Sequence, residues 1–191
     1  MTRIIAGRGK GRRLKSPKGH ETRPTGGRVK QTLFDILAPL VPGCRFLDAF
    51  AGNGGIGLEA LSRGASRVVL VDQSGPAVEA IRENAGALAG AGGSVQVFRQ
   101  DARVALAALA DSGVRFDVVY LDPPYASELY EPLLDQVGRT GLLEPGGVVV
   151  AEHFHKRALP ERIGGLVLTR SVRVGDHRLG FYHRDEAGRA G

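Results

Sequence analysis

Beyond residue 44, apolar runs of strand length alternate with segments whose apolar residues recur at helical spacing. The strand-like runs lie at residues 46–50, 68–72, 95–99, 116–122 and 148–153. The helical patterns between them lie at residues 56–63, 77–88, 103–110 and 129–137. Strands that are apolar throughout and separated by helices are typical of a parallel sheet covered by helices on both faces. The pattern therefore predicts a doubly wound α/β fold.

The pattern changes toward the end of the sequence. Residues 166–174 and 179–183 are strand-like, and only a short turn containing Gly175 and Asp176 separates them. With no helix between them, these two strands should pair antiparallel as a hairpin. The expected sheet is therefore seven-stranded and mostly parallel.

The first 43 residues follow a different pattern. Two short β-prone runs, at residues 3–7 and 12–14, are joined by Gly and Lys residues and are expected to form a small basic hairpin. A helix should follow, because Thr25 can act as its N-cap and the apolar residues after it recur at helical spacing. Prolines and a glycine end that helix. We therefore expect a basic N-terminal extension at residues 1–43 and a main domain at residues 44–191.

Charge is distributed unevenly between these two parts. Residues 1–43 contain ten Lys and Arg against two acidic residues, whereas residues 44–191 contain 16 basic and 18 acidic residues. A basic segment joined to a nearly neutral domain is typical of proteins that bind polyanions, with nucleic acid the first candidate and a solubilising tail the alternative. The candidate RNA-binding residues are Arg3, Arg8, Lys10, Arg12, Arg13, Arg23, Arg28 and Lys30. Removing residues 1–22 should then weaken RNA binding and spare cofactor affinity.

Composition narrows the class of protein further. The 191 residues are 42% hydrophobic, which is enough for one sizeable core. Cys44 is the only cysteine, so an intrachain disulfide and a cysteine-rich zinc site are excluded and a reducing compartment fits. No apolar run approaches the roughly 20 residues of a membrane span, and the basic N-terminus lacks an apolar signal core. We therefore expect a soluble, cytoplasmic protein.

The first strand leads into a glycine-rich turn that begins at Asp48. Gly52, Gly54 and Gly57 match the pattern G-x-G-x-x-G, and Asp72 follows at the end of the next strand, as in enzymes that bind NAD. Glycines let the backbone approach a ligand closely, and the following helix offers its N-terminal amides. Asp48 argues against a dinucleotide, because its carboxylate would repel a pyrophosphate. It could instead attract the ammonium group of an amino acid.

A second candidate site is the tetrapeptide Asp122-Pro123-Pro124-Tyr125, directly after the apolar run of the fourth strand. Each proline fixes its own φ at about −65° and biases the residue before it to extended geometry, so the carbonyls of the turn point in fixed directions. A carboxylate, fixed carbonyls and an aromatic ring suit the binding of a flat ring that carries an amine.

These motifs together resemble a known class of enzyme. Leu47-Asp48-Ala49-Phe50-Ala51-Gly52-Asn53-Gly54, Asp72, Asp101-Ala102 and the tetrapeptide resemble class I S-adenosylmethionine-dependent methyltransferases that act on amines. The narrower resemblance, over nearly the whole chain, is to the RsmD family of bacterial 16S ribosomal RNA guanine-N2 methyltransferases. It rests on Arg3-Ile4-Ile5-Ala6-Gly7, Gly11-Arg12-Arg13-Leu14, Arg23-Pro24-Thr25, Arg28-Val29-Lys30, Leu33-Phe34, residues 57–65 and Gly175-Asp176. Gly26-Gly27 departs from the family, where Thr or Ser followed by Asp is expected.

The resemblance implies a Rossmann-like class I methyltransferase fold and S-adenosylmethionine as methyl donor, with S-adenosylhomocysteine as product and no metal. Asp72 would bind the ribose hydroxyls, Asp101 would meet the adenine amine, and Asp48 would act on the ammonium group directly or through water. For Asp72 and Asp101, a helix-capping Asp after a strand is the structural alternative. The expected cofactor-binding residues are Asp48, Phe50, Gly52, Asn53, Gly54, Asp72, Gln73, Asp101, Ala102 and Asp122.

Amine methylation gives the tetrapeptide a catalytic role. The lone pair of a purine amine is delocalised into the ring, so the amine is a weak nucleophile. If Asp122 and the Pro123 carbonyl each accept one N–H, the lone pair can be directed toward the methyl group, and the positive charge that develops on nitrogen is stabilised. Tyr125 would stack on the extruded base.

The resemblance implies 16S ribosomal RNA as the partner, within the small subunit or its assembly intermediate, and a monomeric enzyme. The residues alone select neither guanine over adenine nor one nucleotide. A DNA adenine-N6 methyltransferase would share the tetrapeptide, but a separate target-recognition domain is not evident. A dinucleotide-dependent oxidoreductase leaves the tetrapeptide unexplained, and a non-catalytic RNA-binding assembly factor leaves the aspartates unexplained.

Three histidines draw attention without a clear role. His153 and His155 share one face of a strand, but two histidines without further ligands make a poor metal site. His177 and Arg178 either border the substrate or belong to an ordinary turn.

Overall fold

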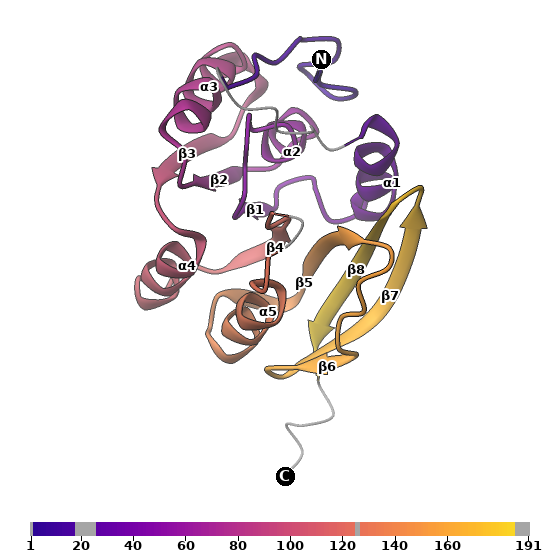
Figure 1. Ribbon diagram of the computed structural model, residues 1–191. Helices are drawn as coiled ribbons and strands as arrows, with labels where there is room; N and C mark the ends of the chain where they lie inside the picture. Colours follow the sequence, from indigo (N-terminus) through magenta and orange to yellow (C-terminus); the bar gives the residue numbers. More distant parts are fainter. Residues whose placement is uncertain (1, 18–25, 125–126, 186–191) are drawn as a thin grey trace. The chain divides into compact units, whose positions relative to one another are not determined.

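The computed structural model describes residues 2–17, 26–124 and 127–185 of the chain. It divides into two compact units, Met1–Ala102 and Arg103–Gly191. Strands and helices alternate along most of both units (Figure 1). The division into a basic extension at residues 1–43 and a domain at residues 44–191 stays a prediction.

Three parallel strands form the sheet of the first unit. Their order is β3 (Ser94–Arg99), β2 (Arg67–Asp72) and β1 (Arg45–Asp48). Residues 68–71 of β2 are fully buried, which accounts for the uninterrupted apolar run in the sequence. β3 exposes much of its length, as a strand with a single neighbour can.

Two helices and a short 3-10 turn accompany this sheet. α2 (Gly57–Ser62) packs on β1 and β2, α3 (Gly75–Gly86) packs on β2 and β3, and η1 (Ala89–Ala91) follows α3. A Cβ atom at Gly57 would lie 2.2 Å from Leu70 Cδ2, so only glycine lets α2 approach β2 this closely. This is the packing role of the third glycine in the G-x-G-x-x-G pattern.

The N-terminal segment packs into the same unit. Arg3 and Arg13 form an antiparallel bridge, as the hairpin prediction required, and Ile4 and Leu14 are buried. α1 (Gly27–Leu37) buries one apolar face and begins after Gly26, its N-cap, with no side-chain capping bond. Thr25, the predicted N-cap, lies outside the described residues.

The second unit combines parallel and antiparallel strands. The order is β4 (Phe116–Leu121), β5 (Leu143–Phe154), β8 (His177–Arg184), β7 (Leu166–Val174) and β6 (Arg162–Ile163). β4 and β5 are parallel, and the other pairs are antiparallel. The predicted hairpin at Gly175 and Asp176 is confirmed.

The described residues thus contain eight strands where seven were expected. The additional strand, β6, has two residues that pair with the start of β7, and a pair of residues is too short to show any periodicity.

Two helices belong to this part of the chain. α4 (Ala102–Asp111) begins at the last residue of the first unit, and α5 (Tyr130–Arg139) packs on β5, β6 and β7. None of the helices in the described parts is both long and apolar enough to cross a membrane.

Candidate active site

Glycine shapes the turn between β1 and α2. Gly52 and Gly54 have φ values of 57° and 81°, in the left-handed region that other residues rarely adopt. The Ala51 N–H donates to the Val71 carbonyl at 2.9 Å, which ties the turn to the end of β2. A side chain at Gly52 would point into open space, so a ligand can reach the backbone there.

Asp48 holds this turn from inside the protein. It ends β1 and is 1% exposed. Its Oδ1 accepts the Phe50 N–H at 3.3 Å, and its Oδ2 accepts the Gly57 N–H at 3.2 Å. The carboxylate therefore joins the start of the turn to the start of α2 with charge-assisted hydrogen bonds. Its predicted action on an ammonium group stays a prediction.

Asp72 links the glycine turn to the entry of α3. Its Oδ2 accepts the Gly52 N–H and its Oδ1 accepts the Ser74 N–H, each at 2.8 Å. The side chain of Ser74, rather than that of Asp72, caps α3. Helix capping therefore does not explain Asp72, whose partly exposed carboxylate has further lone pairs for hydroxyl donors.

The remaining predicted cofactor residues of the first unit lie at the same strand ends. Asn53 folds its side chain back onto the turn, where Oδ1 accepts the Gly55 N–H at 3.1 Å. Gln73 is exposed after β2, and Asp101 is partly exposed just before α4, in which Ala102 is buried. The structure joins Gly52 and Asp72 directly; the contacts predicted for Gln73 and Asp101 stay predictions.

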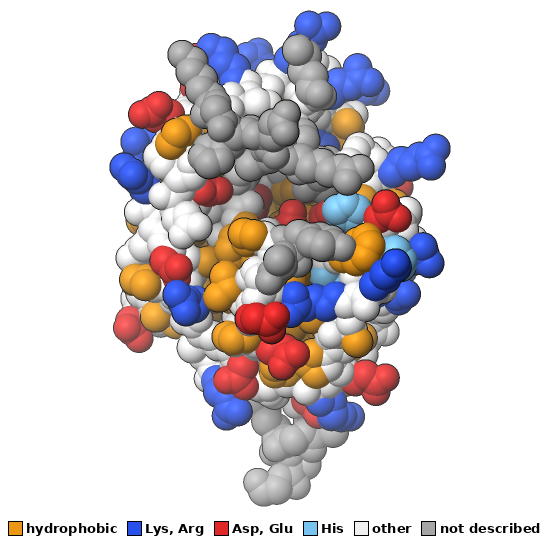
Figure 2. Space-filling model, viewed as in Figure 1, with side chains coloured by type: hydrophobic (Ala, Val, Ile, Leu, Met, Phe, Trp, Pro, Cys, Tyr) orange, Lys and Arg blue, Asp and Glu red, His pale blue; other side chains and the backbone are white. Residues whose placement is uncertain are grey.

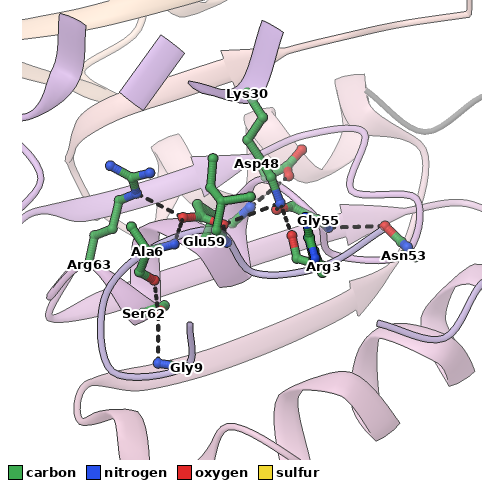
Figure 3. A network of polar contacts seen from close by, with 12 residues as sticks. Arg3, Ala6, Gly9, Lys30, Asp48, Asn53, Gly55, Glu59, Ser62 and Arg63 are labelled. Carbon is green, nitrogen blue, oxygen red and sulfur yellow. Dashed lines mark hydrogen bonds and ion pairs between the residues drawn. The ribbon is translucent and has the colours of Figure 1, made fainter. Parts of the chain in front are cut away.

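A buried ion cluster lies beside the glycine turn (Figure 3). Glu59 of α2 is fully buried, with its Oε2 3.2 Å from Lys30 Nζ and its Oε1 accepting from Arg63 Nε at 2.8 Å. The backbone N–H groups of Ile5 and Ala6 also donate to this carboxylate, at 2.8 and 3.0 Å. One glutamate therefore joins the N-terminal segment, α1 and α2.

Lys30 belongs to this cluster and not to a phosphate-binding surface. Its side chain is 3% exposed, and its Nζ also donates to the Arg3 carbonyl at 2.6 Å and to the Gly55 carbonyl at 3.4 Å. Burial lowers the pKa of Lys30, while the carboxylate of Glu59 opposes that shift. The prediction that Lys30 contacts RNA is therefore wrong, because its ammonium group is held inside the protein.

Most other basic residues of the segment are exposed. Arg8, Lys10 and Arg12 line a cavity of about 420 Å³ beside η1, where Arg8 Nη1 donates to the Ala91 carbonyl at 3.1 Å. Arg3, Arg13 and Arg28 are exposed as well, and Arg23 lies outside the described residues. Contact of these residues with RNA stays a prediction.

In the second unit, the segment after β4 carries the predicted catalytic residues. Asp122 is partly exposed, Pro123 is buried, and Tyr125 lies outside the described residues. The hydroxyl of Tyr130 lies 3.4 Å from the Pro123 carbonyl and 3.0 Å from the Glu152 carbonyl. Burial, and then the nearby Asp122 carboxylate, raise the pKa of Tyr130, so its hydroxyl remains a donor.

A second buried carboxylate supports this segment. Glu152 of β5 is 1% exposed and accepts a hydrogen bond from the hydroxyl of Tyr120. His177 Nδ1 lies 2.7 Å from Glu152 Oε1, so His177 is engaged with β5 and is more than an ordinary turn residue. Tyr130 and Tyr120 therefore connect the end of β4 to Glu152 by backbone and side-chain bonds.

Comparison with known proteins places the chain in a family. The family model described as Conserved hypothetical protein 95 matches residues 2–183. YlbH of Bacillus subtilis (strain 168) is 40% identical over 182 residues, which cover 95% of the chain and 98% of YlbH. Ribosomal RNA small subunit methyltransferase D of Escherichia coli (strain K12) is 32% identical over 186 residues, covering 97% and 91% of the two chains. The chain belongs to the RsmD family.

Solved structures of similar proteins share the fold of this RsmD-family chain. yhhF from Escherichia coli superposes with a TM-score of 0.83 at 32% identity, covering 96% of this chain and 97% of yhhF. Magnesium protoporphyrin IX methyltransferase from Synechocystis PCC 6803, at 20% identity, shares the fold alone, with a TM-score of 0.60 over 82% of this chain and 79% of that one. The predicted class I methyltransferase fold is confirmed.

The sequence analysis did not identify three buried residues that hold the candidate site in place, namely Lys30, Tyr130 and Glu152. Lys30 lies on the apolar face of α1, with Val29, Leu33 and Phe34, and a cation on such a face was the available signal for a buried partner. Glu152, a carboxylate within the apolar run of β5, offered the same kind of signal, whereas Tyr130, an aromatic residue on the amphipathic helix α5, offered none. Among the described residues, no group of three or more His, Cys, Asp or Glu side chains is arranged to hold a metal ion.

Proposed function

We propose that this RsmD-family chain transfers a methyl group from S-adenosylmethionine to the exocyclic N2 amine of a guanine in 16S ribosomal RNA. One observation carries the proposal: Asp122-Pro123-Pro124-Tyr125 follows β4 in a chain that matches Ribosomal RNA small subunit methyltransferase D over 97% of its length. The enzyme would act in the cytoplasm, as a monomer, on the small subunit or its assembly intermediate.

The first unit supplies groups that fit S-adenosylmethionine. Asp72 offers carboxylate oxygens suited to ribose hydroxyls, and open space beside Gly52 leaves the turn backbone accessible. Asp101 and Gln73 would face the nucleoside, and the backbone from Phe50 to Gly54 would hold the amino-acid portion. When bound, S-adenosylmethionine supplies an electrophilic methyl group on a sulfonium. Asp48 holds the turn by accepting the Phe50 and Gly57 N–H groups, and its negative charge would favour binding of the cofactor's ammonium group beside that turn.

The second unit supplies groups that fit an amine. Pro123 has no N–H of its own, and its carbonyl is oriented by the Tyr130 hydroxyl. With the Asp122 carboxylate, this carbonyl would accept the two N–H bonds of the guanine amine and direct its lone pair out of the ring plane. Asp122 would then stabilise the developing positive charge and take up the departing proton. Tyr125 would stack on the base.

The proposal is tested by incubating the purified protein with labelled S-adenosylmethionine and small subunits from a strain that lacks the modification. We expect one labelled guanine in 16S ribosomal RNA, identified as N2-methylguanine by nuclease digestion and mass spectrometry. Label in duplex DNA at adenine would favour a DNA methyltransferase. Thermal stabilisation by NADH but not by S-adenosylhomocysteine would overturn the methyltransferase assignment.

Substitution of Asp122 tests the mechanism. We expect Asp122→Ala to lower kcat by about 100-fold or more, because it removes both an acceptor for the amine and the proton acceptor. Thermal shift with S-adenosylhomocysteine should persist in the variant. Asp135→Asn, at a partly exposed acid of α5 paired with Arg139, serves as the matched control and should keep its turnover. Undiminished kcat in Asp122→Ala would refute the assigned role.

A further inference from the structure

A cavity of about 360 Å³ lies within the second unit, on one face of the C-terminal strands. Cross-strand neighbours His153 of β5 and Arg178 of β8 line it, as do Gly180 and its neighbour Ser171 of β7. The rest of the lining comes from Leu168, Tyr182 and residues of the segment 155–161, which follows β5. We call this space the hairpin cavity. Its volume is within the usual range of ligand sites.

Two cations of the hairpin cavity have no acidic partner among the residues that the structure describes. Arg178 Nη1 donates to Ser171 Oγ at 2.9 Å, which orients the guanidinium, and Lys156 is exposed. Within the described parts of the chain, neither side chain forms an ion pair with a carboxylate, although Glu161 is among the lining residues. In Figure 2, Lys, Arg and His side chains gather over the part of the molecule where Figure 1 shows β5 and β8. An anionic ligand is therefore favoured.

Glycine keeps the floor of the hairpin cavity open. Gly180 stands in the middle of β8. Glycine weakens a strand at such a position because it has no side chain that could pack against neighbouring residues. A Cβ atom there would come within 3.2 Å of Tyr182 Cε2 and 3.4 Å of Leu168 Cδ1, so any larger side chain would crowd the residues that line the floor. Glycine inside a strand commonly marks a site that a ligand approaches closely.

The hairpin cavity is connected to the segment that carries Asp122. Arg157, on its wall, stacks its guanidinium 4.8 Å from the centre of the Tyr130 ring and donates from Nη1 to the Ser127 carbonyl at 2.6 Å. Tyr130 in turn contacts the Pro123 carbonyl. A ligand in the hairpin cavity would therefore be a near neighbour of the base presented to Asp122.

We propose that the hairpin cavity binds one nucleotide of the RNA strand that adjoins the methylated guanine. Its phosphate pairs with Arg178 and Lys156, and its sugar and base lie against Leu159 and Leu168. The proposal rests on the proposed function for the identity of the polymer. The chemistry of the site, an anion bound beside an apolar wall, rests on the cavity alone.

The test compares Arg178→Gln and Lys156→Gln with Arg170→Gln. Arg170 is an exposed cation of β7 that pairs with Phe181 rather than with Gly180, and it does not line the cavity. With small subunits as substrate, we expect each cavity variant to raise KM about tenfold, with kcat and S-adenosylhomocysteine affinity unchanged. The double variant should also reduce the slope of log affinity against log salt by about 0.7, the value for the one phosphate that both cations contact. Arg170→Gln should behave as the unsubstituted chain.

A second measurement does not depend on methyl transfer. Binding of 5′-AMP and of adenosine to the full chain is followed by NMR, with 5′-AMP expected to shift resonances of the hairpin cavity and Arg178→Gln expected to abolish the shift. Equal loss of affinity in Arg170→Gln would mean diffuse attraction and would overturn the site. The site would also be overturned if the cavity variants raised KM with small subunits but not with protein-free 16S ribosomal RNA. That result would indicate that the cavity contacts a ribosomal protein instead of RNA. If methylation fails altogether while 5′-AMP still binds through Arg178, the proposed function falls and the anion site stands.

Discussion

At the scale of single residues, Tyr130 shows how a side chain outside the tetrapeptide governs its geometry. Its one hydroxyl proton is shared between two carbonyls, those of Pro123 and Glu152, and its ring is covered by Arg157. Because burial and Asp122 raise its pKa, it does not ionise in the neutral range and cannot act as a base. Tyr130 is therefore a positioning residue for the carbonyl that would accept the guanine amine.

Tyr130→Phe keeps the ring and removes only the hydroxyl. We expect kcat to fall about tenfold, a loss of about 1.4 kcal/mol of transition-state stabilisation, because the Pro123 carbonyl loses its fixed orientation. KM for the RNA should change little, and pre-steady-state kinetics with saturating small subunits would measure the effect.

The unfolding free energy of Tyr130→Phe shows whether a loss of kcat comes from the position of the Pro123 carbonyl or from a general loss of stability. Losing one buried hydrogen bond should cost about 1 kcal/mol of unfolding free energy, which urea titration can measure. A kcat equal to that of the unsubstituted chain, with the same loss of stability, would show that the hydroxyl serves the fold alone.

At the scale of elements, Glu59 explains why the N-terminal segment is part of the first unit. A buried carboxylate is costly unless charges and donors surround it, and here Lys30, Arg63 and two backbone N–H groups do so. Removing residues 1–22 would withdraw those N–H groups together with buried Ile4 and Leu14. The effect of such a truncation on cofactor affinity stays a prediction, but we now expect some loss, because Lys30 would lose the Arg3 carbonyl and also holds the Gly55 carbonyl of the glycine turn.

Lys30→Met tests this link between elements. We expect the unfolding free energy to fall by about 3 kcal/mol or more, since the change leaves Glu59 buried without its ammonium partner. S-adenosylhomocysteine should bind more weakly, because the glycine turn loses a hydrogen bond at Gly55. Calorimetry would measure both effects, and Lys15→Met, at an exposed ion pair with Glu83, is the control. Equal stability of the two variants would contradict the role given to the buried cluster.

At the scale of the whole molecule, the sequence revealed the elements better than the contacts between them. β2 and β4 were predicted because buried parallel strands are largely apolar, and the hairpin because a short turn at Gly175 and Asp176 joins two strand-like runs. Residue pairs distant in the sequence were not predicted. Lys30 and Glu59 are 29 positions apart, and their contact depends on packing that no local pattern records.

The distribution of charge is also a property of the whole molecule. Lys30 is buried and therefore does not belong to the exposed basic surface of the N-terminal segment. The N-terminal cations that remain exposed include Arg12 and Arg13, whose side chains stand outside the buried cluster. Replacing each by Gln should weaken RNA binding almost equally for all sequences and lower the salt slope by about one per residue, because phosphate contacts carry little sequence information. Fluorescence anisotropy across a series of salt concentrations measures this. Arg139 is an exposed cation of α5 that already pairs with Asp135, so Arg139→Gln should leave the salt slope unchanged. A salt slope that Arg12→Gln and Arg13→Gln do not change would show that these N-terminal cations do not contact RNA.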